Sequence, residues 1–328
     1  QSLSAFLGRM LERMPDGPFL FLFGAHGEGP LLLMIGLLLW VLPLVIFYAL
    51  GHAIVSESGI KDRVTSVLDP IAREIGIAGR DLLPVICGYG NKVIGVLESR
   101  SSSSSTRKPT VSFIALGTAS FYQVAAAGML FTMLGHYWLM APYLLLLFLV
   151  GVLHSRIWYG ALPPEQLVPV SNPSFIQIPR PSAILWHVRA SVKEFVTHAL
   201  PLFALSFLLI GICVHFGAFE ALAQMLAPVM GLFRLPAEAA PALIWSLARK
   251  DIMIAMLSTD TGGIMHALSV GQIFVLVYFA SVFSATLPTL FIIWRELGKK
   301  FALKMMGTQL LTAVVTTLVL AYTIIPWY

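Results

Sequence analysis

Two interrupted apolar segments carry groups that could bind an ion or a solute. In residues 81–99, Pro84 and the run from Gly88 to Gly90 are expected to stop a helix, because proline lacks an N–H donor and glycine favours non-helical backbone. In residues 237–259, Pro241 is expected to do the same. Carbonyls freed at such breaks cannot face lipid and must line a cavity. The sequence therefore predicts helix breaks at Pro84, Gly88, Gly90 and Pro241.

The second segment also contains three consecutive charges, Arg249-Lys250-Asp251, in an apolar setting. Charges at membrane depth are costly and usually functional, so Asp251 is predicted to touch the substrate or a gate. The alternative is that Arg249 extends outward while Lys250 and Asp251 form a structural ion pair. Both interpretations stay open at the level of sequence.

The two segments lie in stretches that resemble each other at an offset of about 157 residues. Leu68-Asp69-Pro70-Ile71 is similar to Leu226-Ala227-Pro228-Val229, and Asp81-Leu82-Leu83-Pro84 is similar to Glu238-Ala239-Ala240-Pro241. A duplicated hydrophobic unit with an interrupted segment in each half is typical of secondary transporters. The pattern predicts a permease with its substrate near the bilayer midplane.

The composition indicates a membrane protein, since 58% of the residues are hydrophobic and only 11% are charged. A helix needs about 20 apolar residues to cross the hydrocarbon. The uncharged runs predict six crossings, which are 31–56, 110–134, 138–155, 195–217, 268–293 and 305–327. The net charge of +5 does not indicate nucleic-acid binding, because Lys and Arg concentrate in the linkers between these runs.

These basic linkers, if cytoplasmic, give the two halves opposite orientations. The predicted fold is an all-α polytopic membrane protein with two inverted repeats, each with three membrane helices, a surface amphipathic helix and a re-entrant broken helix. The predicted domains are an N-terminal surface segment (1–29), a first gate repeat (30–156), a cytoplasmic linker (157–189) and a second gate repeat (190–328).

The chain resembles the membrane domain of FeoB, the bacterial ferrous iron transport protein B, from Ser4 to its C-terminus. The matching segments occur in the family's order and are Glu57-Ser58-Gly59, Gly88-Tyr89-Gly90-Asn91 with Arg100, Phe175-Ile176-Gln177-Ile178-Pro179, Lys250-Asp251, Val282-Phe283-Ser284-Ala285-Thr286 and Arg295-Glu296-Leu297-Gly298. The resemblance implies a permease for a divalent metal, with ferrous iron as the leading candidate, in the bacterial inner membrane. It places the substrate path at Asn91, Ser120, Gln123, Asp251 and Thr286.

The chain departs from the FeoB pattern where the family carries thiols. Asn91 and Thr286 stand in place of the two gate cysteines, and Ser120 lies where the family has Ser-Cys-Gly. Amide and hydroxyl oxygens are harder ligands than thiolate and bind iron more weakly. Lys92 adds a positive charge to the expected cation path, and Cys87 is the one soft ligand near its centre, although buried packing is its default role. Cys87, Lys92 and Lys250 are therefore secondary site candidates.

Two other functions compete with metal transport. A transporter of a small organic or anionic solute on the same scaffold is favoured by Lys92, Arg249 and Lys250, since a basic side chain beside a helix N-terminus attracts anions. A non-transporting membrane subunit could dock a partner through the Pro-rich stretch 162–181. Enzyme motifs such as HExxH, GxSxG and the phosphate-binding loop are absent from the sequence.

The expected partners are membrane lipid, the transported ion or solute, and a separate cytoplasmic G protein or regulator. We expect no permanently bound cofactor and no nucleic acid, and an oligomer is compatible with the pattern. The chain begins with Gln1, just after the position of the family's first membrane helix. We therefore expect a fragment or an edited form of a longer protein.

Overall fold

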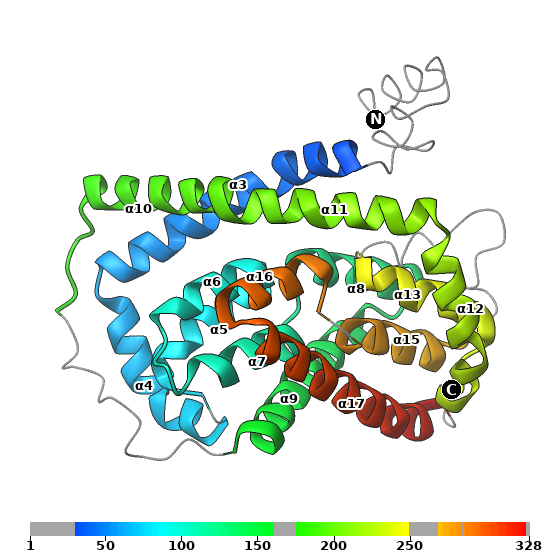
Figure 1. Cartoon of the computed structure of the whole chain (residues 1–328). Coiled ribbons are helices and arrows are strands. Elements are labelled where there is room, and N and C mark those ends of the chain that lie inside the picture. The colour runs from blue at the N-terminus through cyan, green and yellow to red at the C-terminus, as the bar shows by residue number, and fades with distance from the viewer. Residues whose placement is uncertain (1–29, 76, 161–174, 249–267, 284, 326–328) are drawn as a thin grey trace, which may run out of the picture. The chain divides into compact units, whose positions relative to one another are not determined.

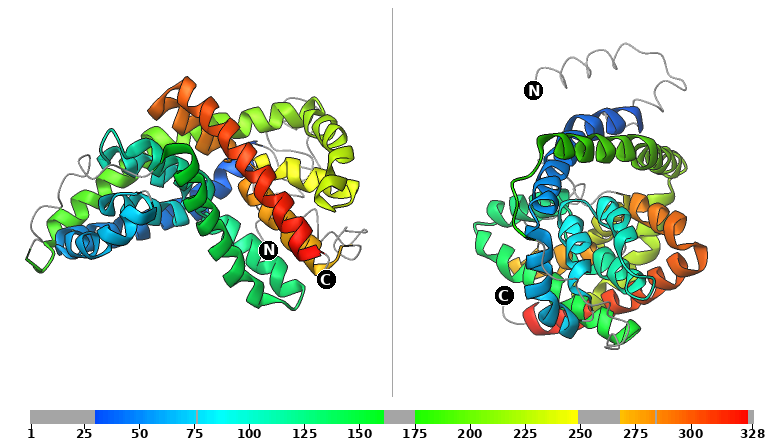
Figure 2. Two further views of the ribbon diagram at one scale, coloured as in Figure 1. Left: turned by 90° about the horizontal axis from the view of Figure 1, so that it is seen from below. Right: turned by 90° about the vertical axis from the view of Figure 1, so that its left-hand side faces the viewer.

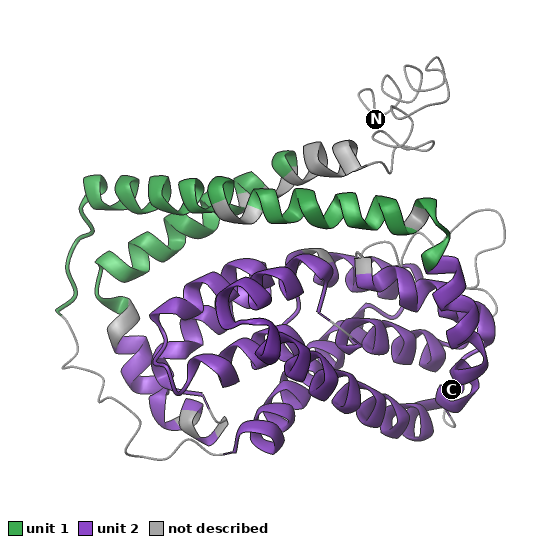
Figure 3. Ribbon diagram, viewed as in Figure 1, with its two compact units in different colours: residues 1–61, 174–218 green, residues 62–173, 219–328 purple. Residues whose placement is uncertain are grey.

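The computed structural model describes residues 30–75, 77–160, 175–248, 268–283 and 285–325, and these form helices joined by short turns with no strand among them (Figures 1 and 2). The all-α prediction is confirmed. The described residues divide into two compact units, one of residues 1–61 and 174–218 and one of residues 62–173 and 219–328 (Figure 3). Each unit takes residues from both halves of the chain.

The first unit consists of two long helical stretches. Helix α3 (Pro30–Glu57) packs along α10 (Pro181–Glu194) and α11 (Leu200–His215), and a π-helical turn (Phe195–Ala199) makes α10 and α11 continuous. The backbone N–H of Gln177 donates to Ser58 O (3.2 Å), which attaches the segment before α10 to the end of α3. Residues 181–189, which end the predicted linker 157–189, form the first part of α10.

The first half of the second unit consists of an amphipathic helix, a helical hairpin, a broken helix and a long helix. The helices are α4 (Ile60–Ile75), α5 (Leu82–Gly90), α6 (Lys92–Glu98), α7 (Arg107–Gly117), α8 (Phe121–Met133) and α9 (Met140–Tyr159). Helices α5 and α6 pack against each other and against α7. The predicted crossing 110–134 is wrong as a single helix, because the chain is extended at Thr118 and Ser120, between α7 and α8.

The second half of this unit has a similar order of elements. The helices are α12 (Ala218–Met230), α13 (Ala240–Ala248), α15 (Val270–Val282), α16 (Leu287–Leu297) and α17 (Lys299–Ile324), the last a long rod drawn in red in Figures 1 and 2. Helix α13 packs against α15, and α15 and α16 both pack against α17. The helical run between α15 and α16 is interrupted around Thr286, where the backbone is extended.

Four helical stretches are long and apolar enough to cross a membrane, counted over the described residues, and they are Tyr137–Tyr159, Pro181–Cys213, Val270–Leu297 and Lys299–Ile324. They correspond to four of the predicted crossings. Helices α7 and α15 are buried along nearly their whole length. Because these helices are buried on all sides, the first parts of the two broken helices form the centre of this unit.

The approach of α7 to α9 depends on two glycines in contact. A Cβ atom at Gly151 would lie 2.5 Å from Gly117 Cα, and one at Gly117 would lie 2.8 Å from Gly151 Cα. The two backbones can approach this closely only without side chains.

We expect Gly151→Ala to destabilise the protein by about 1–3 kcal/mol, because the added methyl group must push α7 and α9 apart. Gly307→Ala in α17 is the matched control, since a Cβ there meets nothing within 4 Å. Thermal unfolding in detergent measures both. Equal unfolding midpoints for the two variants would contradict the proposed contact.

Candidate functional site

The two helix breaks of the second unit expose backbone groups inside an apolar core. Helix α7 ends at Gly117, and Thr118 is extended (φ −107°, ψ 155°). Thr286, which precedes α16, is extended in the same way (φ −62°, ψ 152°). A helix end leaves backbone carbonyls that have no N–H partner in the next helical turn. Such groups need other donors when they are buried, and the identity of these donors defines the site.

At the first break, the hairpin α5–α6 supplies the donors. Lys92 Nζ donates to Ala115 O (2.9 Å), and the Tyr89 hydroxyl donates to Gly117 O (3.1 Å). Both acceptors lie in the last turn of α7. The hairpin therefore stabilises the broken helix through side chains placed on either side of its own bend.

At the second break, α17 supplies a donor. Gln309 Nε2 lies 3.5 Å from Val282 O, whereas Ser246 Oγ of α13 donates to Leu243 O (2.6 Å) and lies 3.4 Å from Ala280 O. The same Gln309 nitrogen lies 3.4 Å from Ala115 O of the first break. An amide nitrogen carries two protons, so the buried Gln309 side chain can serve one carbonyl of each break.

A chain of three buried hydroxyl and amide groups also joins α8, α9 and α15. Gln123 Nε2 donates to Tyr143 Oη (2.9 Å), and Tyr143 Oη lies 2.7 Å from Ser281 Oγ. The Ser281 hydroxyl donates to Val277 O (2.7 Å). Tyr143 is therefore the donor and Ser281 the acceptor in the hydrogen bond between the two hydroxyls. Gln123 Oε1 is buried and accepts no hydrogen bond from the described residues.

Four of the five predicted path residues lie at the start of a helix. Asn91 precedes α6 and accepts a hydrogen bond from Val93 N (2.9 Å), Ser120 precedes α8, and Gln123 lies in the first turn of α8. Thr286 precedes α16, and its hydroxyl lies 3.0 Å from that of Thr289. No hydrogen bond joins two of these four side chains in the described part of the chain. Asp251 and Lys250 lie outside the described residues.

The predicted helix breaks at Pro84, Gly88 and Pro241 are wrong in position. Pro84 and Pro241 lie in the first turns of α5 and α13, where a missing N–H costs no helical hydrogen bond. Gly88 lies inside α5, and a Cβ there would meet Ile114 of α7 at 2.9 Å, so it serves packing. Gly90 is the last residue of α5, and the bend follows it at Asn91 (φ −149°, ψ 119°).

The secondary candidate Cys87 is buried, and its Sγ donates to Leu83 O within α5 (2.8 Å). This geometry agrees with a packing role. No group of three or more His, Cys, Asp and Glu side chains that could hold a metal ion occurs among the described residues.

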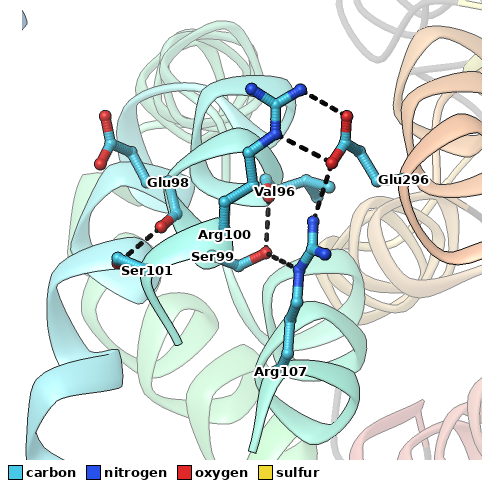
Figure 4. Close-up of polar contacts among 7 residues, drawn as sticks. All are labelled: Val96, Glu98, Ser99, Arg100, Ser101, Arg107 and Glu296. Carbon is cyan, nitrogen blue, oxygen red and sulfur yellow. Dashed lines mark hydrogen bonds and ion pairs between the residues drawn. The ribbon is translucent and has the colours of Figure 1, made fainter. Parts of the chain in front are cut away.

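An ion-pair cluster lies beyond the other end of α6 (Figure 4). Arg100 forms two hydrogen bonds to Glu296 of α16, with Nη2 2.6 Å from Oε1 and Nε 2.9 Å from Oε2. Arg107 Nη2 donates to the same carboxylate (2.8 Å). The Glu296 side chain is only 10% exposed. The cluster ties the hairpin and α7 of the first half to α16 of the second half.

Sequence reasoning missed several of these residues. Three of them, Tyr143, Ser281 and Gln309, lie in uncharged apolar runs of the sequence. A polar side chain in such a run needs a hydrogen-bond partner when it is buried, and this requirement was the available signal. Which partner each one has depends on helix packing and could not be inferred from spacing.

Comparison with known proteins agrees with this architecture. The family model Gate, described as nucleoside recognition, matches residues 196–300. The Fe(2+) transporter FeoB of Methanocaldococcus jannaschii is 20% identical, over 88% of this chain and 48% of the relative. The chain thus spans about half the length of the curated relative that it matches. The resemblance to the FeoB membrane domain is confirmed.

A solved structure of a CNTnw variant in an outward-facing state has a similar fold. The match covers 98% of this chain and 83% of that chain, with a TM-score of 0.53 and 12% identity. At this identity the likeness concerns the fold alone. Together with the four apolar helices of the described residues, the comparisons support a multi-pass membrane protein.

We expect Tyr143→Phe to lower the free energy of unfolding by about 1–3 kcal/mol, because Gln123 and Ser281 lose a shared partner in a buried site. Tyr322→Phe is the control, since Tyr322 is 55% exposed and contacts Arg234 through its ring. Unfolding by heat or denaturant in detergent tests both variants. A Tyr143→Phe protein as stable as Tyr322→Phe would show that the hydroxyl chain contributes nothing.

We expect Glu296→Gln to destabilise the protein by on the order of 1–2 kcal/mol, since charge-assisted hydrogen bonds to two arginines become neutral ones. The effect is moderate because the Arg100 side chain is 42% exposed. Glu238→Gln, an exposed carboxylate with no ion pair among the described residues, is the matched control. Raised salt should narrow the difference between Glu296→Gln and the parent protein, and a salt-independent difference would argue against an electrostatic origin.

Proposed function

We propose that this chain is a membrane permease whose substrate passes the two helix breaks of the second unit. The observation that carries the proposal is the Gln309 side chain, which reaches a freed carbonyl of each break. The two helix breaks of the apolar core therefore lie within reach of one side chain. Secondary transporters bind substrates and ions at such discontinuous helices.

Ferrous iron is the first substrate to test. The relative that matches 88% of the chain is named an Fe(2+) transporter. The hydroxyls of Ser120 and Thr286, the amide of Asn91 and freed carbonyls supply oxygen ligands, and Asp251 would supply the negative charge. The oxygen set suits a hard divalent cation better than a soft one.

A small organic or anionic solute is the second candidate, and the buried Lys92 favours it. An ammonium group has three protons, and Ala115 O is the one acceptor of Lys92 Nζ among the described residues. The remaining protons could be donated to a solute. The helix N-termini at Asn91, Ser120 and Thr286 add positive potential. The family model described as nucleoside recognition points to the same class.

The two candidates differ in the charge that the site must accept. A dication about 7 Å from the Lys92 ammonium would be repelled by roughly 5 kcal/mol at an effective dielectric constant of about 20. Iron transport therefore requires a compensating carboxylate, for which Asp251 is the candidate. An anionic solute would instead be attracted by Lys92.

Flux into vesicles that contain the purified chain separates the two candidates. An iron permease should take up Fe²⁺ under reducing conditions, and Asp251→Asn should lower the rate at least about tenfold, the effect of losing roughly 1.4 kcal/mol. The control is Glu238→Gln. Fe²⁺ uptake that is unchanged in Asp251→Asn would remove this residue from the path.

A solute permease should instead take up an organic anion or a nucleoside such as uridine, without effect of divalent metals. In this case Thr286→Val should lower the rate while leaving the unfolding temperature within a few degrees of the parent, because only a side-chain hydroxyl at a helix N-terminus is lost. Absence of any flux, together with a stable soluble partner in pull-down, would support the non-transporting subunit instead.

A further inference from the structure

His154 of α9 is a fully buried histidine that the proposed path does not use. Its Nε2 atom lies 3.0 Å from the Ser112 hydroxyl of α7, and its Nδ1 atom lies 2.8 Å from the Thr312 hydroxyl of α17. The ring therefore connects the helix that ends at the first break to the helix that carries Gln309. Because both ring nitrogens have partners, neither is available to a metal ion or a solute.

The hydrogen bonds of Thr312 decide which ring nitrogen carries the proton. The Thr312 hydroxyl donates its only proton to Thr308 O (2.9 Å), so it must accept from His154 Nδ1. It also accepts from Trp158 Nε1 (3.2 Å), one turn further along α9. In the neutral ring Nδ1 therefore carries the proton, and Nε2 accepts from the Ser112 hydroxyl. The bridge thus has a fixed direction, from Ser112 through the ring to Thr312.

This bridge lies one helical turn from the Gln309 contact on both helices. Ser112 lies three residues before Ala115 in α7, and residues at this spacing share a helix face. In α17, Thr312 lies three residues after Gln309. Gln309 Nε2 is 3.4 Å from Ala115 O and 3.5 Å from Val282 O, which is the limit of a hydrogen bond. A small increase in the separation of α7 and α17 would break the first of these contacts.

Helix α9 gives the ring a fixed base, because its backbone lies against that of α7. A Cβ atom at Gly151 would lie 2.5 Å from Gly117 Cα, so the two helices already meet as closely as glycines allow. His154 lies three residues after Gly151, on the same face of α9. The position of the ring relative to α7 is therefore set by the backbones, and the bond from Nδ1 to Thr312 extends this position to α17.

We propose that His154 is a positioning residue for the two helix breaks. Its ring, with the proton on Nδ1, sets the separation of α7 and α17, and this separation keeps Gln309 within reach of Ala115 O and Val282 O. His154 acts through Gln309 and does not touch the substrate. The inference rests on the proposed function only in that the breaks line the substrate path, and the link between His154 and Gln309 is tested without transport.

A double-mutant cycle on the full chain in detergent tests this link. His154→Leu removes both hydrogen bonds of the ring, and Gln309→Leu removes the contacts to the breaks. His215→Leu is the matched control, because His215 is an exposed histidine at the end of α11. We expect His154→Leu to lower the unfolding temperature clearly less in the Gln309→Leu background than in the parent, since the contact that it positions is already lost. The effect of His215→Leu should be the same in both backgrounds.

The ring tautomer and a conservative variant provide readouts that packing alone would not change. In protein labelled with ¹⁵N-histidine, the NMR signals that are absent from His154→Asn belong to His154, and they should show the proton on Nδ1. His154→Asn keeps an amide that can donate to Thr312, so it should retain more of the coupling to Gln309 than His154→Leu does.

Flux into vesicles measures the consequence for transport. The probe is Fe²⁺ or uridine, whichever the parent protein takes up. We expect His154→Leu to lower the rate about tenfold, the size of effect that a residue outside the binding site exerts through others. His154→Asn should restore most of the rate, and His215→Leu should leave it unchanged.

Additive effects of His154→Leu and Gln309→Leu on the unfolding temperature would overturn the proposal, and so would a parent ring with its proton on Nε2 alone. If His154→Leu does not fold, Thr312→Val replaces it in the cycle, because this variant removes one hydrogen bond of the bridge and keeps the shape of the side chain. If the parent protein takes up neither Fe²⁺ nor uridine, the proposed function loses its support, and the cycle still decides whether His154 positions Gln309.

Discussion

Backbone carbonyls that lose their helical partners in an apolar core must find other donors, and the second unit of this protein is organised around that requirement. Lys92 and Tyr89 of the hairpin donate to the end of α7, and Gln309 of α17 reaches both broken helices. Each donor comes from an element distant in sequence from its acceptor. The breaks can therefore persist only while these helices stay packed together.

Close packing of the helices is what brings the donors into reach. Gly95 of α6 has no room for a Cβ against Pro84 O and Gly88 of α5, and Gly88 itself lies against α7. Larger residues at these positions would separate the hairpin from α7. Because a hydrogen bond weakens steeply beyond about 3.5 Å, small residues in the hairpin are a condition for the contact between Lys92 and Ala115.

The hydrogen bonds of the polar core differ in length. Gln309 shares one nitrogen between two long hydrogen bonds of 3.4 and 3.5 Å. The Arg100–Glu296–Arg107 cluster, by contrast, holds the hairpin and α7 to α16 with distances of 2.6–2.9 Å. The Gln309 contacts are therefore the long ones of this unit, while the Lys92 contact to Ala115 O (2.9 Å) and the Glu296 cluster are short.

The sequence alone determined that the protein is helical, lies in a membrane and resembles the FeoB membrane domain, because uncharged runs and ordered motifs are local properties of the chain. It also marked Asn91, Ser120, Gln123 and Thr286, which all lie at helix starts beside the breaks. It misplaced the breaks at Pro84, Gly88 and Pro241, since proline in a first turn and glycine in a packed helix leave the helix intact. Only the tertiary structure decided where the helices stop and which donor serves each carbonyl, because burial and the reach of side chains from other helices set the cost of each break.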